Sequence, residues 1–438
     1  MTKPKIIVLD DDPTGSQTVH SCLLLMQWDV ETLVTGLRDP APIFFVLTNT
    51  RALPAAEAAA RVQTVCANLK QALQVAPQEH FILVSRSDST LRGHYPLETD
   101  VMAAELGPFD AHFLIPAFLE GGRITRDSVH YLLVNGIPTP VHETEFARDS
   151  VFAYHHSYLP DYVAEKTQGR IPADQVQRFT LADIRQGCRH RLVTLSGNVC
   201  GVVDAETPGD LQQFAQDLLA ASQAGKQFLL RSAASILTAL ADLPPQPLPP
   251  TAMAQLRPYP DHPGVVIVGS HVHKTTTQLQ HLLQQPGIRP IEVEVRRLLN
   301  LYEFDPLLQE VNTRVKAAFQ AGFTPVVYTS RQELTFPSQQ ERLDFGIRVS
   351  QFLMQVVQHL PRHLAFLISK GGITSNDTLS QGLGLTAVRL WGQILPGVSV
   401  VVTPPDHPHL PNLPVVLFPG NVGDPEALST VYHRLQGK

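Results

Sequence analysis

Short apolar runs alternate with longer segments of helical periodicity along most of the chain. The runs at residues 5–10, 43–48 and 81–85 each end in polar residues, which is typical of buried strands that enter a turn. The Ala-rich segment at 54–73 predicts a helix with Pro54 near its first turn. The pattern therefore favours an α/β fold from the first hundred residues onward.

The same alternation continues to the end of the chain. Further strands are predicted at 112–116, 192–195, 201–204, 228–231, 265–270, 291–295, 325–329 and 364–369 and in the segment that begins at 415, with another helix at 208–224. Strands that alternate with helices indicate largely parallel sheets flanked by helices.

Eight prolines fall between residues 244 and 263. This density cannot continue a helix or a central strand, and it favours an extended connector. We therefore predict an α/β domain at 1–243, a proline-rich linker at 244–263 and a second α/β domain at 264–438.

Composition narrows the class of protein. The 438 residues are 43% hydrophobic and 17% charged, with a net charge of −6. These values argue against disorder and give no basic field that would attract nucleic acid or an anionic membrane. No apolar run reaches the roughly 18 residues of a membrane helix, and the acidic start predicts no secretory signal. The four cysteines form no CxxC pair, so a reduced, cytoplasmic protein is expected.

Unusual polar loops follow the predicted strands of the first domain. The first contains Asp10, Asp11 and Asp12, whose carboxylates repel one another unless a cation or a hydroxyl engages them. A helix N-cap is the alternative, although it needs only one aspartate. The two acids after Asp10 are predicted to point to opposite sides of an extended chain, so only one of them would face a substrate.

Arginines dominate the next two loops. Arg86, Asp88 and Arg92 lie within the loop at 85–94, and a planar guanidinium suits bidentate capture of a carboxylate or a phosphate. The alternative is an Arg–Asp pair that stabilises its own loop. The loop at 116–123 adds Gly-Gly and Arg123, where backbone could approach a ligand.

Glycine-rich loops follow three predicted strands of the second domain. A strand that runs through Gly and Ser into a helix is the arrangement of an anion site, because free backbone N–H groups face the ligand. The sequence is no Walker A motif, since Lys274 stands where its second glycine belongs. The candidate phosphate-binding residues are Gly269, Ser270, Gly371, Gly372, Ile373, Thr374 and Gly420.

Other motifs carry little chemistry. The GxGxxA match at 382–387 follows a helical stretch and is interpreted as a turn. The His-x-His pairs lack further ligands with the spacing of a metal site, so no protein metal site is predicted. No GxSxG nucleophile elbow is present.

Taken together, these loops resemble the four-carbon acid sugar kinase family, formerly a domain of unknown function. The resemblance spans nearly the whole chain, and its most specific motif is D-S-T-L-R-G at 88–93, supported by D-D-P-T-G at 11–15. The family pattern implies that the N-terminal domain holds the sugar acid and the C-terminal domain holds ATP.

The resemblance is incomplete in the second domain. The family's G-S-C-S appears as G-S-H-V at 269–272, and its G-G-D-T appears as G-G-I-T at 371–374, which loses the acid. Asp377 is a candidate replacement for that acid. The late G-N-x-G matches residues 420–423. These departures indicate a divergent branch of the family.

The resemblance implies an ATP-dependent phosphotransferase that acts on a hydroxyl of a small sugar acid. Arg92, with Arg86 or Arg123, would hold the substrate carboxylate. Asp12, Asp11 or Asp88 would accept the hydroxyl proton, with Asp12 favoured. Mg²⁺ would bridge the phosphates and be held mainly by nucleotide and water.

Two alternatives remain open on the sequence. One is a divergent homologue that binds sugar acid or nucleotide with weak or no kinase activity. The other is a nicotinamide-dependent dehydrogenase, which the missing strand–GxGxxG–helix unit disfavours. The partners expected are small molecules, and both the sugar acid and the oligomeric state, including a homo-oligomer, stay open.

Overall fold

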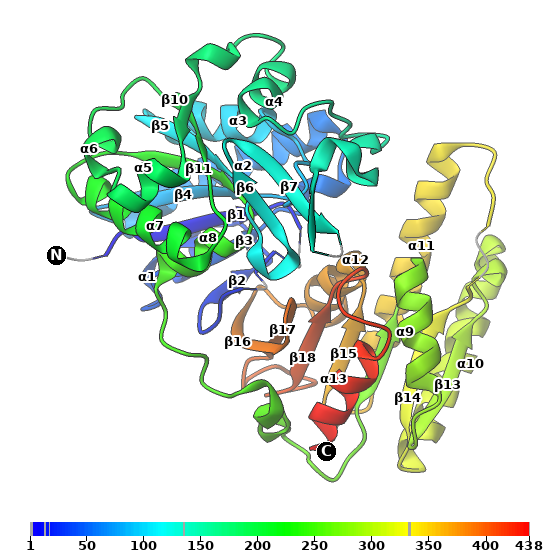
Figure 1. The fold of residues 1–438 in the computed structure, drawn as a ribbon. Coiled ribbons are helices and arrows are strands. Elements are labelled where there is room, and N and C mark those ends of the chain that lie inside the picture. The colour runs from blue at the N-terminus through cyan, green and yellow to red at the C-terminus, as the bar shows by residue number, and fades with distance from the viewer. Residues whose placement is uncertain (1–2, 13–14, 17, 135, 332–333, 438) are drawn as a thin grey trace. The chain divides into compact units, whose positions relative to one another are not determined.

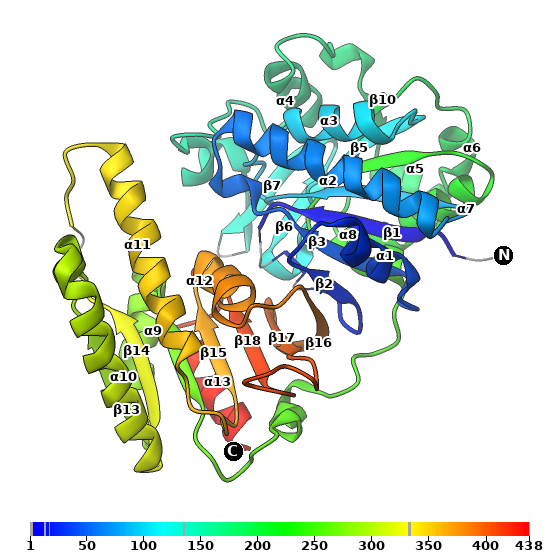
Figure 2. The same cartoon turned by 180° about the vertical axis from the view of Figure 1, so that it is seen from behind.

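The chain forms two compact units, Met1–Pro245 and Gln246–Lys438. The computed structural model describes residues 3–12, 15–16, 18–134, 136–331 and 334–437. Figures 1 and 2 show the elements of each unit. Most of the proline-rich segment belongs to the second unit, where the side chain of Met253 is fully buried in the core.

A parallel sheet forms the centre of the first unit. Its strand order is β2-β3-β1-β4-β11-β5-β10-β9, and every neighbouring pair is parallel. The strands are β1 (Lys5–Asp10), β2 (Leu23–Leu25), β3 (Ile43–Leu47), β4 (Phe81–Arg86), β5 (Ala111–Ile115), β9 (Gln177–Phe179), β10 (Val199–Val203) and β11 (Phe228–Ser232). Every residue of β1 and β3 is buried, because helices cover both faces of the sheet.

Helices cover this sheet on its two faces. Figure 2 shows α1 (Val30–Arg38), α2 (Ala55–Val75) and α3 (Leu97–Leu106) on one face, where α2 packs against both neighbours. Figure 1 shows the other face, with α5 (Leu181–Gln186), α6 (Arg189–Leu192), α7 (Pro208–Gln223) and α8 (Ser235–Ala241). The predicted helices at 54–73 and 208–224 are confirmed as α2 and α7.

A small antiparallel sheet supplements the first unit. It consists of β6 (Arg123–Arg126), β7 (Val129–Val134) and β8 (Ile137–Pro140), and α4 (Leu159–Lys166) follows it in the chain. Apolar and polar residues do not alternate clearly along these strands, so the sequence pattern does not predict them. Their placement matters for the site because Arg123 begins β6.

One predicted strand is wrong. Residues 192–195 form the end of α6 and the turn after it, and the strand begins later, at Val199. Leu192 is fully buried, whereas Val193 is 36% exposed. The apolar run therefore reflects one buried helix turn that packs towards α7.

The second unit repeats the parallel arrangement and adds a hairpin. Its strand order is β13-β14-β12-β15-β18-β17-β16, parallel from β13 to β18, with β17 antiparallel to both neighbours. The strands are β12 (Val265–Val268), β13 (Ile288–Val293), β14 (Thr324–Thr329), β15 (Leu367–Lys370), β16 (Ala387–Leu395), β17 (Val398–Val402) and β18 (Pro414–Phe418). The predicted parallel α/β fold is confirmed in both units, whereas β16 and β17 were missed.

The helices of the second unit pack in pairs. They are α9 (His273–Leu283), α10 (Phe304–Gln320), α11 (Gln339–Gln358), α12 (Gly372–Asp377) and α13 (Ala427–Gln436). Helix α9 contacts α13, and α10 contacts α11. Within the described parts of the chain, no helix combines the length and the hydropathy needed to cross a bilayer.

Candidate functional site

The polar loops of the first unit meet at one edge of its sheet. Asp10 at the end of β1 stands in register with Arg86 of β4 and with Leu47 of β3. Because the three strands are parallel, the residues that follow them emerge at the same edge. The loops after β1, β3 and β4 therefore form one cluster, as expected for a ligand site of a parallel α/β sheet.

Asp10 and Arg86 form a buried pair at the base of this cluster. Arg86 Nη1 lies 3.2 Å from Asp10 Oδ1, and the second carboxylate oxygen has no partner among the described atoms. Burial raises the pKa of Asp10 to about 7, against the opposing charge of Arg86. A Cβ at Gly15 would lie 2.1 Å from this carboxylate, so the loop needs glycine there. Pro13 and Thr14 of the predicted turn lie outside the described residues.

Arg51 organises the other two acids and was not predicted. Its guanidinium donates to both oxygens of Asp11 and, at 2.9 Å, to Asp12 Oδ2. Burial lowers its pKa, but the charges of Asp11 and Asp12 outweigh this and raise it. The prediction that the two acids point to opposite sides is wrong, because the chain is no longer extended after β1 and both carboxylates reach one guanidinium.

The two acids differ in exposure. The side chain of Asp11 is 2% exposed and that of Asp12 is 27% exposed. Arg51 stands four residues beyond β3, so the strand-end rule applied to the other loops would have found it.

Arg231, which the sequence did not predict as a site residue, contacts the same cluster through Ser85 and Ser87. Arg231 in β11 donates 2.6 Å to Ser85 Oγ and 2.7 Å to Ser87 Oγ, and it forms an ion pair with Glu98. Ser87 Oγ in turn donates 2.7 Å to Asp11 Oδ2. Arg231 was missed because it lies within an apolar strand, where the sequence carries no loop signal.

Asp88 and Arg92 lie at a small pocket in this cluster. Arg92 Nε donates 2.8 Å to Asp88 Oδ2, and the guanidinium lies 4.9 Å from the ring centroid of Phe146. Burial alone would raise the pKa of Asp88, but Arg51 and Arg92 lower it well below its usual range. The pocket is lined by Ser87, Asp88, Leu91, Arg92, Tyr95, Leu114, Pro116, Tyr162, Arg231 and Ser232.

The loop conformation depends on Gly93, whose φ is +120°. A Cβ there would lie 2.5 Å from Ser87 Oγ and 2.7 Å from Arg231 Nη2. This glycine therefore allows the Arg92 backbone to cross directly over the polar cluster.

Arg123 approaches the same region from β6. Its Nη1 donates to the carbonyl of Gly121, and its Nε has no partner among the described atoms. Burial lowers the pKa of Arg123, while Asp88 raises it and Arg92 lowers it further.

The three predicted glycine loops of the second unit converge around Ser270. A Cβ at Gly371 would lie 3.0 Å from Ser270 Cβ, and a Cβ at Gly420 would lie 3.0 Å from Ser270 Oγ. Thr275 Oγ1 donates 2.8 Å to the carbonyl of Gly420 and contacts Ser270 Oγ at 3.2 Å. The structure thus brings together loops that are about 100 and 50 residues apart in the sequence.

Thr374 contacts two of these glycine loops. We call the cluster of residues 269–270, 371–374 and 420 the cradle. A Cβ at Gly269 would lie 2.3 Å from Thr374 Oγ1, and Gly371 has a φ of +126° that only glycine adopts readily. Gly372 begins α12, and Ile373 beside it is 60% exposed. The backbone N–H groups of Gly269 and Ser270 donate to the carbonyl of Lys370, and that of Gly371 donates to the carbonyl of Phe418. The N–H groups suited to a phosphate here are therefore those at the start of α12, residues 372–374.

Two further polar residues lie in the segment that contains the glycine loop at 371–374, at positions 370 and 377. The ammonium of Lys370 is fully buried, donates to the carbonyl of Pro419 and lies 4.0 Å from the ring centroid of Phe418. Burial and, to a smaller extent, the charge of Lys274 together lower the pKa of Lys370 to about 7. Asp377, the candidate replacement for the family's acid, accepts from Ser350 on α11.

The donor set for a metal ion is sparse. No group of three or more His, Cys, Asp or Glu side chains capable of holding a metal occurs among the residues that the structure describes.

Comparison with known proteins gives two family matches and one similar fold. A sugar-binding N-terminal domain model matches residues 6–240, and a nucleotide-binding C-terminal domain model matches residues 265–428. The crystal structure of a Salmonella typhimurium LT2 protein superposes with a TM-score of 0.69 at 21% identity, covering 99% of this chain and 98% of that one. At this identity the likeness shows the fold alone.

Two curated kinases show sequence similarity to parts of the chain. A D-erythronate kinase from Heliobacterium modesticaldum is 29% identical over 48% of this chain and 47% of its own length. A D-threonate kinase from Bordetella bronchiseptica is 31% identical over 42% of this chain and 45% of its own length. The chain thus spans about half the length of the curated relatives it matches. The two domain models together cover most of the sequence, and the chain belongs to the four-carbon acid sugar kinase family.

Proposed function

We propose that the protein is an ATP-dependent kinase that phosphorylates a hydroxyl group of a small sugar acid, with four carbons as the expected size. The convergence of the three glycine loops around Ser270, inside the region matched by the nucleotide-binding model, carries this proposal. The names of the two kinase relatives support the class of acceptor.

Arg92 is our candidate for holding the substrate carboxylate. It lines the small pocket, and its side chain is 24% exposed, so part of its guanidinium faces solvent. Arg123 is the second candidate, since its Nε lacks a partner among the described atoms. Arg86 has a different role in this proposal, because its side chain is 7% exposed and pairs with Asp10. It positions the acidic loop and does not touch substrate.

Asp12 is our candidate for the group that accepts the hydroxyl proton. Its side chain is the more exposed of the two acids that contact Arg51. Asp11 then acts as a positioning residue, held between Arg51 and Ser87. Phosphoryl transfer depends mainly on positioning and charge stabilisation, so orientation of the acceptor hydroxyl is the larger part of this role.

The nucleotide phosphates are assigned to the cradle of the second unit. Backbone N–H groups at the start of α12, residues 372–374, and at Gly420 would bind them, with the Ser270 hydroxyl close by. The N–H groups of Gly269, Ser270 and Gly371 donate to backbone carbonyls and hold the loops in place. Glycine at 371 and 420 lets both loops pack closely against Ser270, because a Cβ at either position would lie 3.0 Å from the Ser270 side chain. Mg²⁺ supplies charge neutralisation on the phosphates when bound, and its ligands would be mainly phosphate and water.

A screen for ADP release tests the proposal. The protein is incubated with Mg·ATP and a panel of four-carbon sugar acids, and ADP is measured with a coupled assay. We expect acid-dependent ADP release with at least one acid and none with the corresponding neutral sugars. If ATP binds but no acid causes release of ADP, the result would favour a non-catalytic homologue. Tight NADH binding without ATP binding would favour a dehydrogenase.

A further inference from the structure

Side chains from a separate segment hold three consecutive carbonyl groups of the Asp88–Arg92 loop, which comprises residues 88–92. The three contacts are the Ser89 carbonyl with His130 Nε2 at 2.7 Å, the Thr90 carbonyl with the Tyr154 hydroxyl at 2.7 Å and the Leu91 carbonyl with the Tyr162 hydroxyl at 2.8 Å. His130 lies in β7, Tyr162 lies in α4, and Tyr154 lies between these elements. The backbone of the loop is therefore fixed by residues that follow it by 41 to 71 positions in the chain.

The three donors keep their protons near neutral pH. Burial raises the pKa of Tyr154 and of Tyr162 above the usual value for tyrosine. Burial also lowers the pKa of His130 to about 4, against its hydrogen bond to Ser89, so the ring is neutral. Because a carbonyl only accepts, Nε2 of this ring carries the proton, and Nδ1 accepts from the Thr125 hydroxyl at 2.9 Å. The hydrogen bonds to the loop thus persist across the pH range in which an enzyme of this kind is assayed.

The loop has a backbone conformation that its own residues do not favour. Leu91 has a φ of +66°, in the left-handed region that residues with a Cβ rarely adopt. Its side chain is buried in one cluster with Tyr95, Tyr154 and Tyr162, and the rings of Tyr154 and Tyr162 meet edge to face with centroids 5.7 Å apart. Strained backbone of this kind persists where the surrounding structure determines it, and it is concentrated at functional sites. The tyrosines supply both the hydrogen bonds and the apolar contacts that hold Leu91 in place.

The same segment contacts the guanidinium of Arg92. The ring centroid of Phe146 lies 4.9 Å from this group, and Asp149 Oδ2 lies 3.6 Å from Arg92 Nη1. Asp88 accepts from Arg92 Nε at 2.8 Å. A guanidinium that is already oriented loses less freedom when it binds an anion, so this arrangement favours a preformed site for a carboxylate.

We infer that Tyr154 and Tyr162, together with His130, are positioning residues that fix Arg92 for the sugar-acid carboxylate before the substrate binds. The inference rests on the proposed kinase function and adds residues outside the loop that determine affinity for the acid. Tyr162 also lines the small pocket, whereas Tyr154 is not one of its lining residues. The Tyr154 hydroxyl lies 3.4 Å from the Val141 carbonyl, so its shorter contact with the loop is the main one. Tyr154 is therefore the residue whose effect on the acid is transmitted through the loop.

Tyr154→Phe tests the inference, because it removes the hydroxyl and keeps the ring. The matched control is Tyr432→Phe, which also removes a buried hydroxyl that donates to a backbone carbonyl, that of Pro286 in the second unit. Rates of ADP release are measured with Mg·ATP and the four-carbon sugar acid that the wild type turns over fastest. We expect Tyr154→Phe to raise KM for the acid about tenfold, the effect of one hydrogen bond lost from a buried carbonyl, and to change kcat and KM for ATP by less than about twofold. Tyr432→Phe should change none of the three.

A double variant separates positioning from general destabilisation. If Tyr154 acts through Arg92, then Tyr154→Phe should raise KM for the acid by less than about twofold in the Arg92→Lys protein, because the bidentate group that it orients is already lost. A tenfold effect in both backgrounds would show that Tyr154 acts elsewhere, and it would overturn the inference.

Hydrogen exchange of the protein without ligands gives a second measurement that does not depend on catalysis. We expect peptides that cover residues 87–95 to exchange faster in Tyr154→Phe than in the wild type or in Tyr432→Phe, because the loop opens more often when one of its carbonyls loses a partner. Unchanged exchange in these peptides, or an unchanged KM for the acid, overturns the inference and leaves the kinase proposal standing. If the wild type releases no ADP with any acid, the kinase proposal fails, and this inference fails with it.

Discussion

The carboxyl group of Asp10 is completely buried, so its protonation should make the free energy of unfolding depend on pH. Its folded-state pKa of about 7 exceeds the ordinary value of 3.8, so between these values the folded protein binds more protons than the unfolded chain. This contribution to stability is present below about pH 4 and is lost as the pH rises through 7. Asp10→Asn keeps a neutral side chain at every pH and abolishes that dependence.

Urea unfolding at pH 5 and pH 8 tests this. We expect wild type to lose stability relative to Asp10→Asn by on the order of 1–3 kcal/mol between the two values, since one pKa unit corresponds to about 1.4 kcal/mol. Asp29→Asn is the control, because the hydrogen bonds of Thr32 lower the pKa of Asp29 and no titration falls in this window. The raised pKa is wrongly assigned to Asp10 if the stability difference between wild type and Asp10→Asn is the same at both pH values, or if it changes in favour of wild type at pH 8.

Arg92 should contribute to sugar-acid binding through the planar, bidentate geometry of its guanidinium as well as through its charge. Arg92→Lys is expected to weaken sugar-acid binding by roughly one to two decades, which corresponds to about 1.5–3 kcal/mol for a charge-assisted contact. ATP affinity should not change, because Arg92 belongs to the first unit. Arg170→Lys is the matched control, an exposed arginine paired with Asp100. Normal sugar-acid affinity together with lost ATP binding would reverse the proposed division of roles.

Asp11 and Asp12 should respond differently to the same substitution. Asp12→Asn is expected to lower turnover by about 10²–10⁴-fold with little change in substrate affinity, since it removes the proton acceptor. Asp11→Asn removes a buried partner of Arg51 and should lower the free energy of unfolding by about 3 kcal/mol. Turnover is measured at saturating Mg·ATP and stability by thermal unfolding. Near-normal turnover in both variants would make the loop structural and direct the search to Asp88.

At the scale of elements, the turn between β15 and α12 depends on glycine. Gly371 has a φ of +126°, and a Cβ there would lie 3.2 Å from the backbone nitrogen of Ser270. Gly371→Ala should therefore strain the loop and weaken ATP binding by tenfold or more, measured by calorimetry. Gly346→Ala on α11 is the control, because a Cβ added there would have no other atom within 4 Å. That substitution should raise stability by up to about 1 kcal/mol and leave ATP affinity unchanged. Equal ATP affinity in Gly371→Ala and wild type would show that the cradle does not bind phosphate.

At the scale of the whole molecule, each ligand should protect a different unit. Hydrogen exchange with Mg·ATP is expected to slow in the loops after β12, β15 and β18, and exchange with a bound sugar acid should slow in the loops after β1 and β4. The reason is that strand-end loops lose solvent access when a ligand binds to their N–H groups. Protection of the first unit by ATP alone would contradict the assignment of the two domains.

The sequence alone was sufficient for the parallel α/β fold, because buried parallel strands are continuous apolar runs that need no partner information to recognise. It also located the candidate glycine loops and the Asp88–Arg92 loop, since each directly follows such a strand. It failed at residues 192–195, where one buried turn of helix has the same apolar length as a strand.

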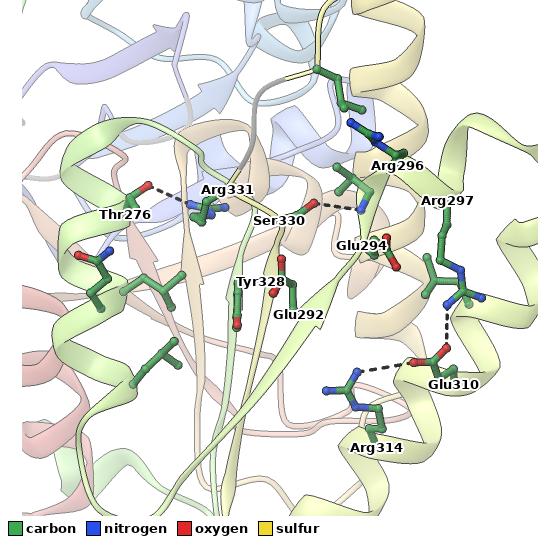
Figure 3. A pocket seen from close by; sticks show the side chains of 16 residues that line it. Thr276, Glu292, Glu294, Arg296, Arg297, Glu310, Arg314, Tyr328, Ser330 and Arg331 are labelled. Carbon is green, nitrogen blue, oxygen red and sulfur yellow. Dashed lines mark hydrogen bonds and ion pairs between the residues drawn. The ribbon is translucent and has the colours of Figure 1, made fainter.

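Only the tertiary structure decided which polar residues act together. Arg51 and Arg231 come from β3's loop and from within β11, and they reach Asp11 and Ser87 because the parallel register aligns those strand ends. A pocket of about 730 Å³ in the second unit is likewise lined by side chains from α9, β13, β14 and α10 that meet only after folding (Figure 3). Local periodicity is a property of neighbouring residues and can be read along the chain. Ion pairing and cavity shape depend on contacts between distant segments, which register and helix packing determine.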